Sequence, residues 1–222
     1  MTKAAKSKWH PKMLKKTFID IPFYIITHPF KGFDEMKSQG LGEIRYAVVF
    51  LLLYGMVRAW QIMSTGFVVT GFWWDQPSIN VPEILLYTFS PIALICIANW
   101  SITSITNGSG RLKEIFMVYC YALYPSLFLR IIGTVLSNNV TVGEAAFATF
   151  FFSFGNVLLY FFLFIGLLVI HEYTFFRGVL MVILTALAAM VIVFVLALFF
   201  SLLGEVINFI FTIVQELDAH VL

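Results

Sequence analysis

Five long apolar stretches dominate the pattern of hydrophobic and polar positions along this 222-residue chain. They cover residues 46–69, 83–105, 115–137, 145–170 and 178–203. A helix of about 20 apolar residues crosses the ~30 Å hydrocarbon core of a bilayer, so each stretch is long enough to span a membrane. The pattern therefore predicts an all-α, polytopic membrane bundle of about five transmembrane helices.

Shorter amphipathic segments flank these spans at both ends. Within residues 18–40, Phe30, Phe33 and Met36 recur every three positions, which places them on one face of a short helix. We expect this helix to lie in the membrane interface, with Phe30 and Phe33 as anchors. Residues 204–222 carry a second apolar stripe, so they are predicted to form an amphipathic C-terminal segment along the outer surface.

The composition fits the same class of protein. Hydrophobic residues make up 60% of the chain and charged residues 12%, whereas soluble domains average about 45–50% and about 25%. Mean hydropathy is +0.92. The chain is thus predicted to be an integral membrane protein.

Basic residues are distributed unevenly and predict an orientation. Residues 1–17 form a lysine-rich tail, expected to be cytosolic and to contact the anionic inner leaflet rather than nucleic acid. The loops 70–82 and 138–144 contain no lysine or arginine. The remaining basic residues close to span ends all fall on the other side: Lys31, Lys37, Arg45, Arg111, Lys113 and Arg177. The positive-inside rule then predicts a plasma-membrane protein with a cytoplasmic N-terminus and an outside C-terminus.

Several residues have predicted structural roles at the span ends and bends. Trp73 and Trp74 follow the first span and are expected to be interfacial anchors. Pro91 and Pro125 lie inside the second and third spans, where proline bends a helix. A tight cytosolic turn connects these two spans, and its residues are Asn107, Gly108, Gly110 and Arg111.

Four polar residues inside the spans are the candidates for function: Arg58, Asn99, Arg130 and Asn156. An arginine at the centre of a membrane helix costs about 2.5–3.5 kcal/mol on insertion scales, so Arg58 is expected to face the bundle interior or a wet cavity. Arg130 lies closer to a span end, from which its side chain could reach the interface. Two interpretations stay open: arginines capped by carbonyls and Asn side chains, or an anion path lined by Arg58 and Arg130.

The sequence lacks the patterns of a membrane enzyme. His171 and Glu172 have no second histidine at the spacing of a zinc protease. The spans contain no pair of carboxylates away from their ends, as proton-coupled transport or aspartyl proteolysis usually needs. Cys96 and Cys120 both fall in apolar runs without metal-motif spacing. We expect no catalytic residue, no metal and no cofactor.

Three short features together resemble the Ypt-interacting-protein (Yip) domain family: His28-Pro29-Phe30, the Gly108–Arg111 turn, and the run Tyr119–Pro125. The likeness covers about residues 18–203. It implies a non-enzymatic multispan membrane protein. Eukaryotic Yip proteins associate with Rab-type GTPases in secretory traffic, and some bacterial relatives are linked with ABC transporters. The short lysine-rich N-terminus, in place of a long cytosolic region, favours the bacterial type.

Three functions are compatible with these observations. The first is an accessory or interaction protein that docks onto a larger membrane complex, such as the subunits of an ABC transporter. The second is a small transporter or channel for an anion. The third is a membrane-trafficking factor of the eukaryotic Yip type.

Overall fold

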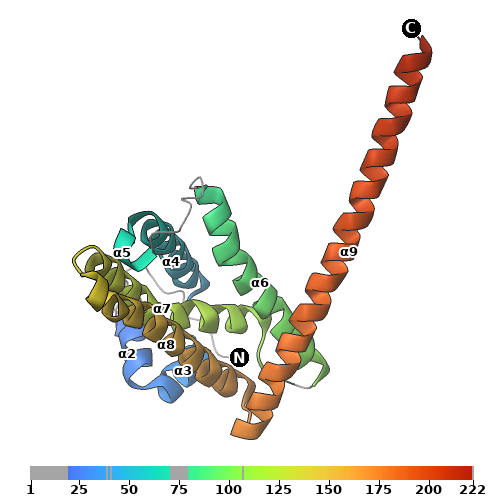
Figure 1. Cartoon of the computed structure of the whole chain (residues 1–222). Helices are drawn as coiled ribbons and strands as arrows, with labels where there is room; N and C mark the ends of the chain where they lie inside the picture. Colours follow the sequence, from blue (N-terminus) through green and yellow to red (C-terminus); the bar gives the residue numbers. More distant parts are fainter. Residues whose placement is uncertain (1–19, 39, 41, 71–79, 107, 222) are drawn as a thin grey trace.

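The computed structural model describes residues 20–38, 40, 42–70, 80–106 and 108–221, and this part of the chain is helical and contains no strand. Five helices are long and apolar enough to cross a membrane. The predicted all-α bundle is therefore confirmed, and the chain is an integral membrane protein (Figure 1). In chain order the helices are α2 (Ile21–Thr27), α3 (Pro29–Ser38), α4 (Ile44–Ser64), α5 (Phe67–Thr70), α6 (Val81–Ile105), α7 (Leu112–Ser137), the 3-10 helix η2 (Val142–Glu144), α8 (Ala145–His171) and α9 (Phe175–Val221).

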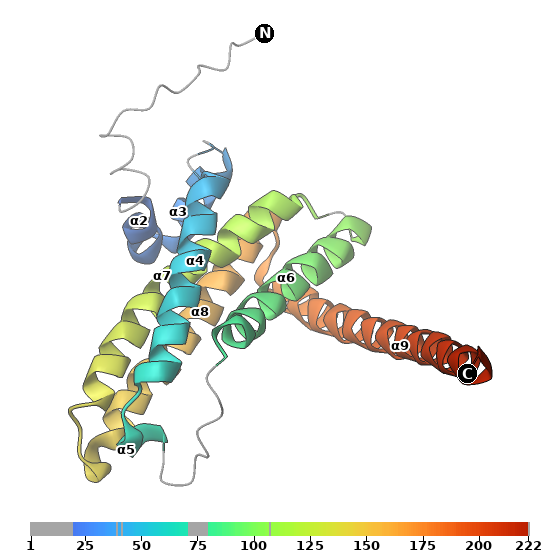
Figure 2. The same ribbon diagram turned by 90° about the horizontal axis from the view of Figure 1, so that it is seen from above.

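Helix α7 is the centre of the bundle. It packs most extensively against α8 and then against α4, and its apolar side chains are buried on most faces (Figures 1 and 2). Gly133 allows α8 to come close, because a Cβ at this position would lie 2.6 Å from the Phe152 ring. Small residues at helix crossings are the usual way for membrane helices to pack closely. Both α6 and α7 continue through their internal prolines, Pro91 and Pro125.

Helix α3 packs into the bundle. The sequence had instead predicted that its aromatic face, Phe30 and Phe33, anchors it in the membrane interface. Phe33 and Met36 are fully buried, whereas Phe30 is exposed. The Phe33 ring lies against Gly166 of α8, where a Cβ would be 3.1 Å from the ring. Phe33 therefore anchors α3 to α8 rather than to lipid, and only Phe30 keeps the exposure that an interfacial anchor needs.

An ion pair joins the same two helices at their ends. The Lys37 ammonium lies 2.8 Å from a Glu172 carboxylate oxygen and donates a hydrogen bond to the carbonyl of Ile170. This contact lowers the pKa of the exposed Glu172 carboxyl. Glu172 also ends α8 in the left-handed conformation, with φ of 56°.

The first predicted span is shorter than expected. Helix α4 ends at Ser64, and the chain turns at Gly66 before the short helix α5. The Gly66 N–H donates to Ser137 Oγ at 2.9 Å, so the turn lies against the end of α7. Trp73 and Trp74 fall outside the described residues. The helices α6, α7 and α8 match their predicted bounds to within three residues.

The C-terminal segment is not separate from the fifth span. Helix α9 is continuous over 47 residues, with no break at Gly204. At 1.5 Å per residue it is about 70 Å long, more than twice the hydrocarbon core of a bilayer. Its N-terminal part packs against α6, and its C-terminal part projects away from the bundle (Figure 1). From residue 191 to 213, every side chain except Ile192 and Gly204 is exposed.

Candidate functional site

The two intramembrane arginines meet at a single side chain, Gln61. Arg58 and Gln61 are three residues apart on α4, a spacing that puts them on the same helix face. Arg58 Nη1 donates to Gln61 Oε1 at 2.9 Å. Arg130 Nη1, from α7, donates to the same oxygen at 2.9 Å. The two nitrogens can therefore be no farther apart than twice 2.9 Å.

Arg130, on α7, is held by side chains of two neighbouring helices, α4 and α8. Besides the bond to Gln61, its Nε donates to the Tyr54 hydroxyl at 3.1 Å, and its Nη2 donates to Asn156 Oδ1 of α8. Arg130 is only 6% exposed, so its side chain does not extend to the interface as its position near the span end allowed. The structure thus brings together three of the four predicted polar candidates, Arg58, Arg130 and Asn156.

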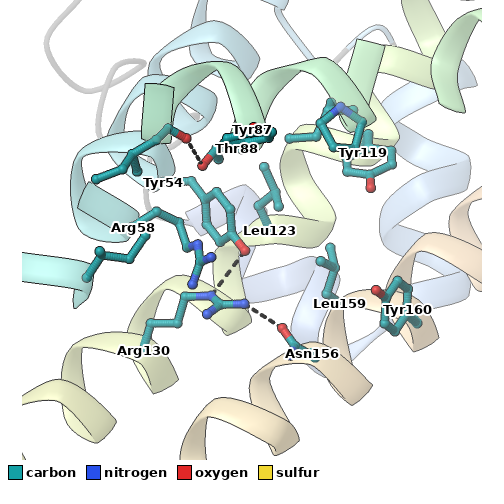
Figure 3. Close-up of a pocket in the computed structure, with 14 residues that line it drawn as sticks. Tyr54, Arg58, Tyr87, Thr88, Tyr119, Leu123, Arg130, Asn156, Leu159 and Tyr160 are labelled. Carbon is teal, nitrogen blue, oxygen red and sulfur yellow. Dashed lines mark hydrogen bonds between the residues drawn. The ribbon is translucent and has the colours of Figure 1, made fainter. Parts of the chain in front are cut away.

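A cavity of about 260 Å³ lies beside this cluster (Figure 3). Figure 3 shows the guanidinium groups of Arg58 and Arg130 close together on one side of the cavity, with Asn156 next to Arg130. None of the described lining residues is acidic. The lining comes from α4, α6, α7 and α8 and consists of Tyr54, Arg58, Ile62, Ile84, Tyr87, Thr88, Pro91, Ile92, Tyr119, Leu123, Arg130, Asn156, Leu159 and Tyr160.

This arrangement leaves positive charge and hydrogen-bond donors available. A guanidinium carries five N–H donors and stays protonated in proteins. The described side chains accept one bond from Arg58 and three from Arg130, so most donors of Arg58 are unused. Two like charges about 6 Å apart repel by about 3 kcal/mol at an effective dielectric constant of about 20. A bound anion would offset this repulsion and accept the unused donors.

Asn99 belongs to a separate polar cluster at the opposite end of the bundle. Gly110 N–H donates to His171 Nδ1 at 3.1 Å, so this nitrogen must be the acceptor and Nε2 carries the proton. His171 Nε2 then donates to Asn99 Oδ1 at 3.2 Å, and Asn99 Nδ2 donates to Thr185 Oγ1 at 3.1 Å. The chain of bonds ties the turn after α6 to α8 and α9.

The predicted glycine turn is a packing element of this second cluster. A Cβ at Gly108 would lie 2.8 Å from His171 Nδ1, and one at Gly110 would lie 2.6 Å from the His171 ring. Arg111 is exposed and precedes α7, with its N–H bound by Glu114. Asn107 falls outside the described residues. His171, Asn99 and Thr185 all have hydrogen-bond partners within the cluster, and we assign it a structural role.

Sequence reasoning missed Gln61, Tyr54 and Thr185, the neutral partners of the charged and amide side chains. Gln61 lies three positions after Arg58 in the sequence, but nothing in the pattern predicted that it also accepts from Arg130. Within the described ranges, no group of three or more His, Cys, Asp or Glu could hold a metal ion.

Comparisons with known proteins identify no relative of this chain. No family model, no curated protein and no solved structure matches this chain. The Yip-domain resemblance therefore stays a prediction, as do the orientation in the membrane and the partners that it implies.

Proposed function

We propose that this membrane protein binds an anion between Arg58 and Arg130, and that the cavity beside them is its functional site. One observation carries the proposal: two guanidinium groups share one amide oxygen at the wall of a cavity whose described lining contains no carboxylate. Such a site can bind a solute or a lipid that carries negative charge. This corresponds to the anion transporter or channel that the sequence left open.

A purely structural role explains Arg130 better than Arg58. Arg130 donates to three side chains on two neighbouring helices, as a helix-joining arginine should. Arg58 makes one side-chain bond and lines the cavity. Placing such a charge in a membrane helix costs a few kcal/mol, so a compensating ligand is the simplest reason for Arg58 to be there.

Thermal unfolding of the purified chain in a non-ionic detergent tests the proposal. At constant ionic strength, inorganic phosphate or sulfate should raise Tm, because a ligand at 100 times its Kd stabilises the folded state by about 2.7 kcal/mol. Arg58→Gln should abolish the rise. Arg45→Gln is the matched control, since Arg45 is an exposed arginine at the other end of the same helix. Equal rises in wild type and Arg58→Gln would refute the proposed site.

A second candidate function is that of an accessory subunit in a larger membrane complex, and the exposed length of α9 favours it. Beyond its contact with α6, this helix presents apolar side chains such as Phe194 and Phe200, which are 63% and 65% exposed. The Yip-domain resemblance suggests the same role, with ABC transporter subunits or trafficking proteins as partners. Native mass measurement after gentle extraction should then give a complex of defined stoichiometry, and a lone monomer in every lipid condition would contradict it.

A further inference from the structure

The cavity beside Arg58 and Arg130 opens between two membrane helices. Its side walls come from α6 and α8, which are not among the extensively packed helix pairs of the bundle. Tyr87 on α6 and Tyr160 on α8 line the cavity and are 70% and 64% exposed, so they form its rim. Figure 3 shows Tyr87 beside Thr88 on α6 and Tyr160 on α8, with Tyr160 on the far side of the cavity from Arg58.

The helix positions place this opening within the membrane. Arg58 lies six residues before the end of α4, Arg130 seven before the end of α7, and Tyr87 six after the start of α6. At 1.5 Å per residue, all three are about 9–11 Å from the same end of the bundle. Tyr160, on the other side of the mouth, lies 15 residues after the start of α8, about 22 Å from that end. Because a hydrocarbon core is about 30 Å thick, both sides of the mouth between α6 and α8 lie at depths that face lipid.

The lining has a charged end and an apolar end. Arg58, Arg130 and Asn156 form the charged end. Away from these residues the lining is largely apolar, through side chains that include Ile84, Ile92, Leu123 and Leu159. A ligand that satisfies both ends has an anionic head and an aliphatic part. The cavity volume of about 260 Å³ is below the range of about 300–1,000 Å³ for drug-sized ligands, so it has room for a head group and not for a whole lipid.

We infer that the anion is the phosphate of a membrane lipid, which enters sideways between α6 and α8 while its acyl chains remain in the bilayer. The inference rests on the proposed anion site and adds the class of ligand and its route. Phosphate is the group that suits this site, because its several oxygens can accept parallel N–H bonds from two guanidinium forks at once. The rim hydroxyls of Tyr87 and Tyr160 are then near the glycerol and ester region.

Lipid binding to the full-length chain in non-ionic detergent, followed by native mass spectrometry, tests the ligand class. Phosphatidic acid should bind at least ten-fold more tightly than diacylglycerol with the same acyl chains, which lacks only the phosphate. Arg58→Gln should reduce phosphatidic acid binding to the level of diacylglycerol, and Arg45→Gln should leave it unchanged. Inorganic phosphate at equal concentration should compete poorly; competition as strong as that of the lipid would identify a free anion and overturn the inference.

The route is tested by photo-crosslinking in vesicles that contain phosphatidic acid. A photoreactive amino acid at position 160 should capture this lipid more strongly than one at position 161, which contacts only the bulk bilayer. Phe161 is the matched control, because it is 51% exposed at the same depth of α8 but does not line the cavity. Equal capture at both positions would overturn sideways entry.

The two proposals fail in different ways. If phosphate raises Tm through Arg58 but phosphatidic acid binds no better than diacylglycerol, the anion site stands and the lipid inference is wrong. If Arg58→Gln changes neither the rise in Tm with phosphate nor the binding of phosphatidic acid, both proposals are wrong.

Discussion

At the scale of single residues, Gln61 determines how two positive charges coexist inside the bundle. Its amide oxygen accepts from both arginines, yet the amide carries no charge to neutralise either one. Gln61 and Arg130 are only 8% and 6% exposed, so water contributes little to the solvation of this pair. The site is therefore held in shape while its net charge stays positive, which is the condition for attracting an anion.

Gln61→Glu should convert the binding site into a closed ion-pair cluster. The new carboxylate would lie where both guanidinium groups already donate, and hydrogen bonds to charged groups contribute about 1.5–3 kcal/mol. We expect Tm without ligand to rise by several degrees, and the further rise with phosphate to disappear. Thermal unfolding with and without phosphate measures both effects.

Gln61→Leu is the control for this change, because it removes the shared acceptor without adding charge. It should lower Tm below that of the wild type, since two donors then lose their partner. A Gln61→Glu variant that still responds to phosphate like the wild type would show that the anion binds elsewhere.

At the scale of elements, the end of α4 depends on a glycine. The Cβ of any other residue at position 66 would lie 2.1 Å from the carbonyl oxygen of Ser137 and 2.7 Å from its carbon, which are backbone atoms of α7. Asn138 Nδ2 also donates to the Ser64 carbonyl at 2.7 Å, so the two helix ends are joined on both sides of this turn. Gln61 lies only three residues before Ser64.

Gly66→Ala should therefore destabilise the protein. Relief of the clash requires the end of α4 to move away from α7, and overpacking of this kind typically costs about 1–3 kcal/mol. We expect a Tm several degrees below that of the wild type, together with weaker stabilisation by phosphate. Gly143→Ala is the control, because a Cβ there meets nothing within 4 Å. Equal Tm values for the two variants would mean that α4 and α7 do not approach each other at Gly66.

The sequence predicted the elements that depend on local hydrophobicity and missed those that depend on distant partners. The bounds of α6, α7 and α8 were predictable because long apolar runs are bounded by charged or turn residues. The end of α4 was not, since Gly66 breaks the helix by lying against Ser137, a residue far along the chain. Gly204 looked like a helix end, yet α9 continues through it. Membrane helices tolerate glycine, and nothing near Gly204 competes for its backbone.

The candidate site was predictable in the same partial way. Arg58 and Arg130 were identified because a charged side chain inside a membrane span costs free energy whatever its neighbours are. Their meeting at Gln61, and the distance of Asn99 from them, depend on how α4, α7 and α8 pack. Phe33 could not be placed from the sequence for the same reason. The period of an amphipathic helix is the same whether its apolar face contacts lipid or a neighbouring helix.

At the scale of the whole molecule, the length of α9 constrains how the bundle lies in a membrane. Its apolar part, Phe175–Ile213, is 39 residues long and so extends for about 58 Å. A helix of this length crosses a ~30 Å core only with strong tilt or by continuing beyond the bilayer. We expect it to cross once, and five crossings would then place the two ends of the chain on opposite sides of the membrane.

Site-directed labelling with a membrane-impermeant maleimide measures this topology. In intact cells, a cysteine that replaces Ser78 or His220 should be labelled from outside, whereas one that replaces Ser7 should react only after permeabilisation. The expectation follows from the basic residues, which are absent from loop 70–82 and concentrated before residue 17. Cys96 and Cys120 are both buried, so they should give little background. Labelling of positions 78 and 220 from opposite sides would mean that α9 does not cross as one span, and the predicted five-span topology would be wrong.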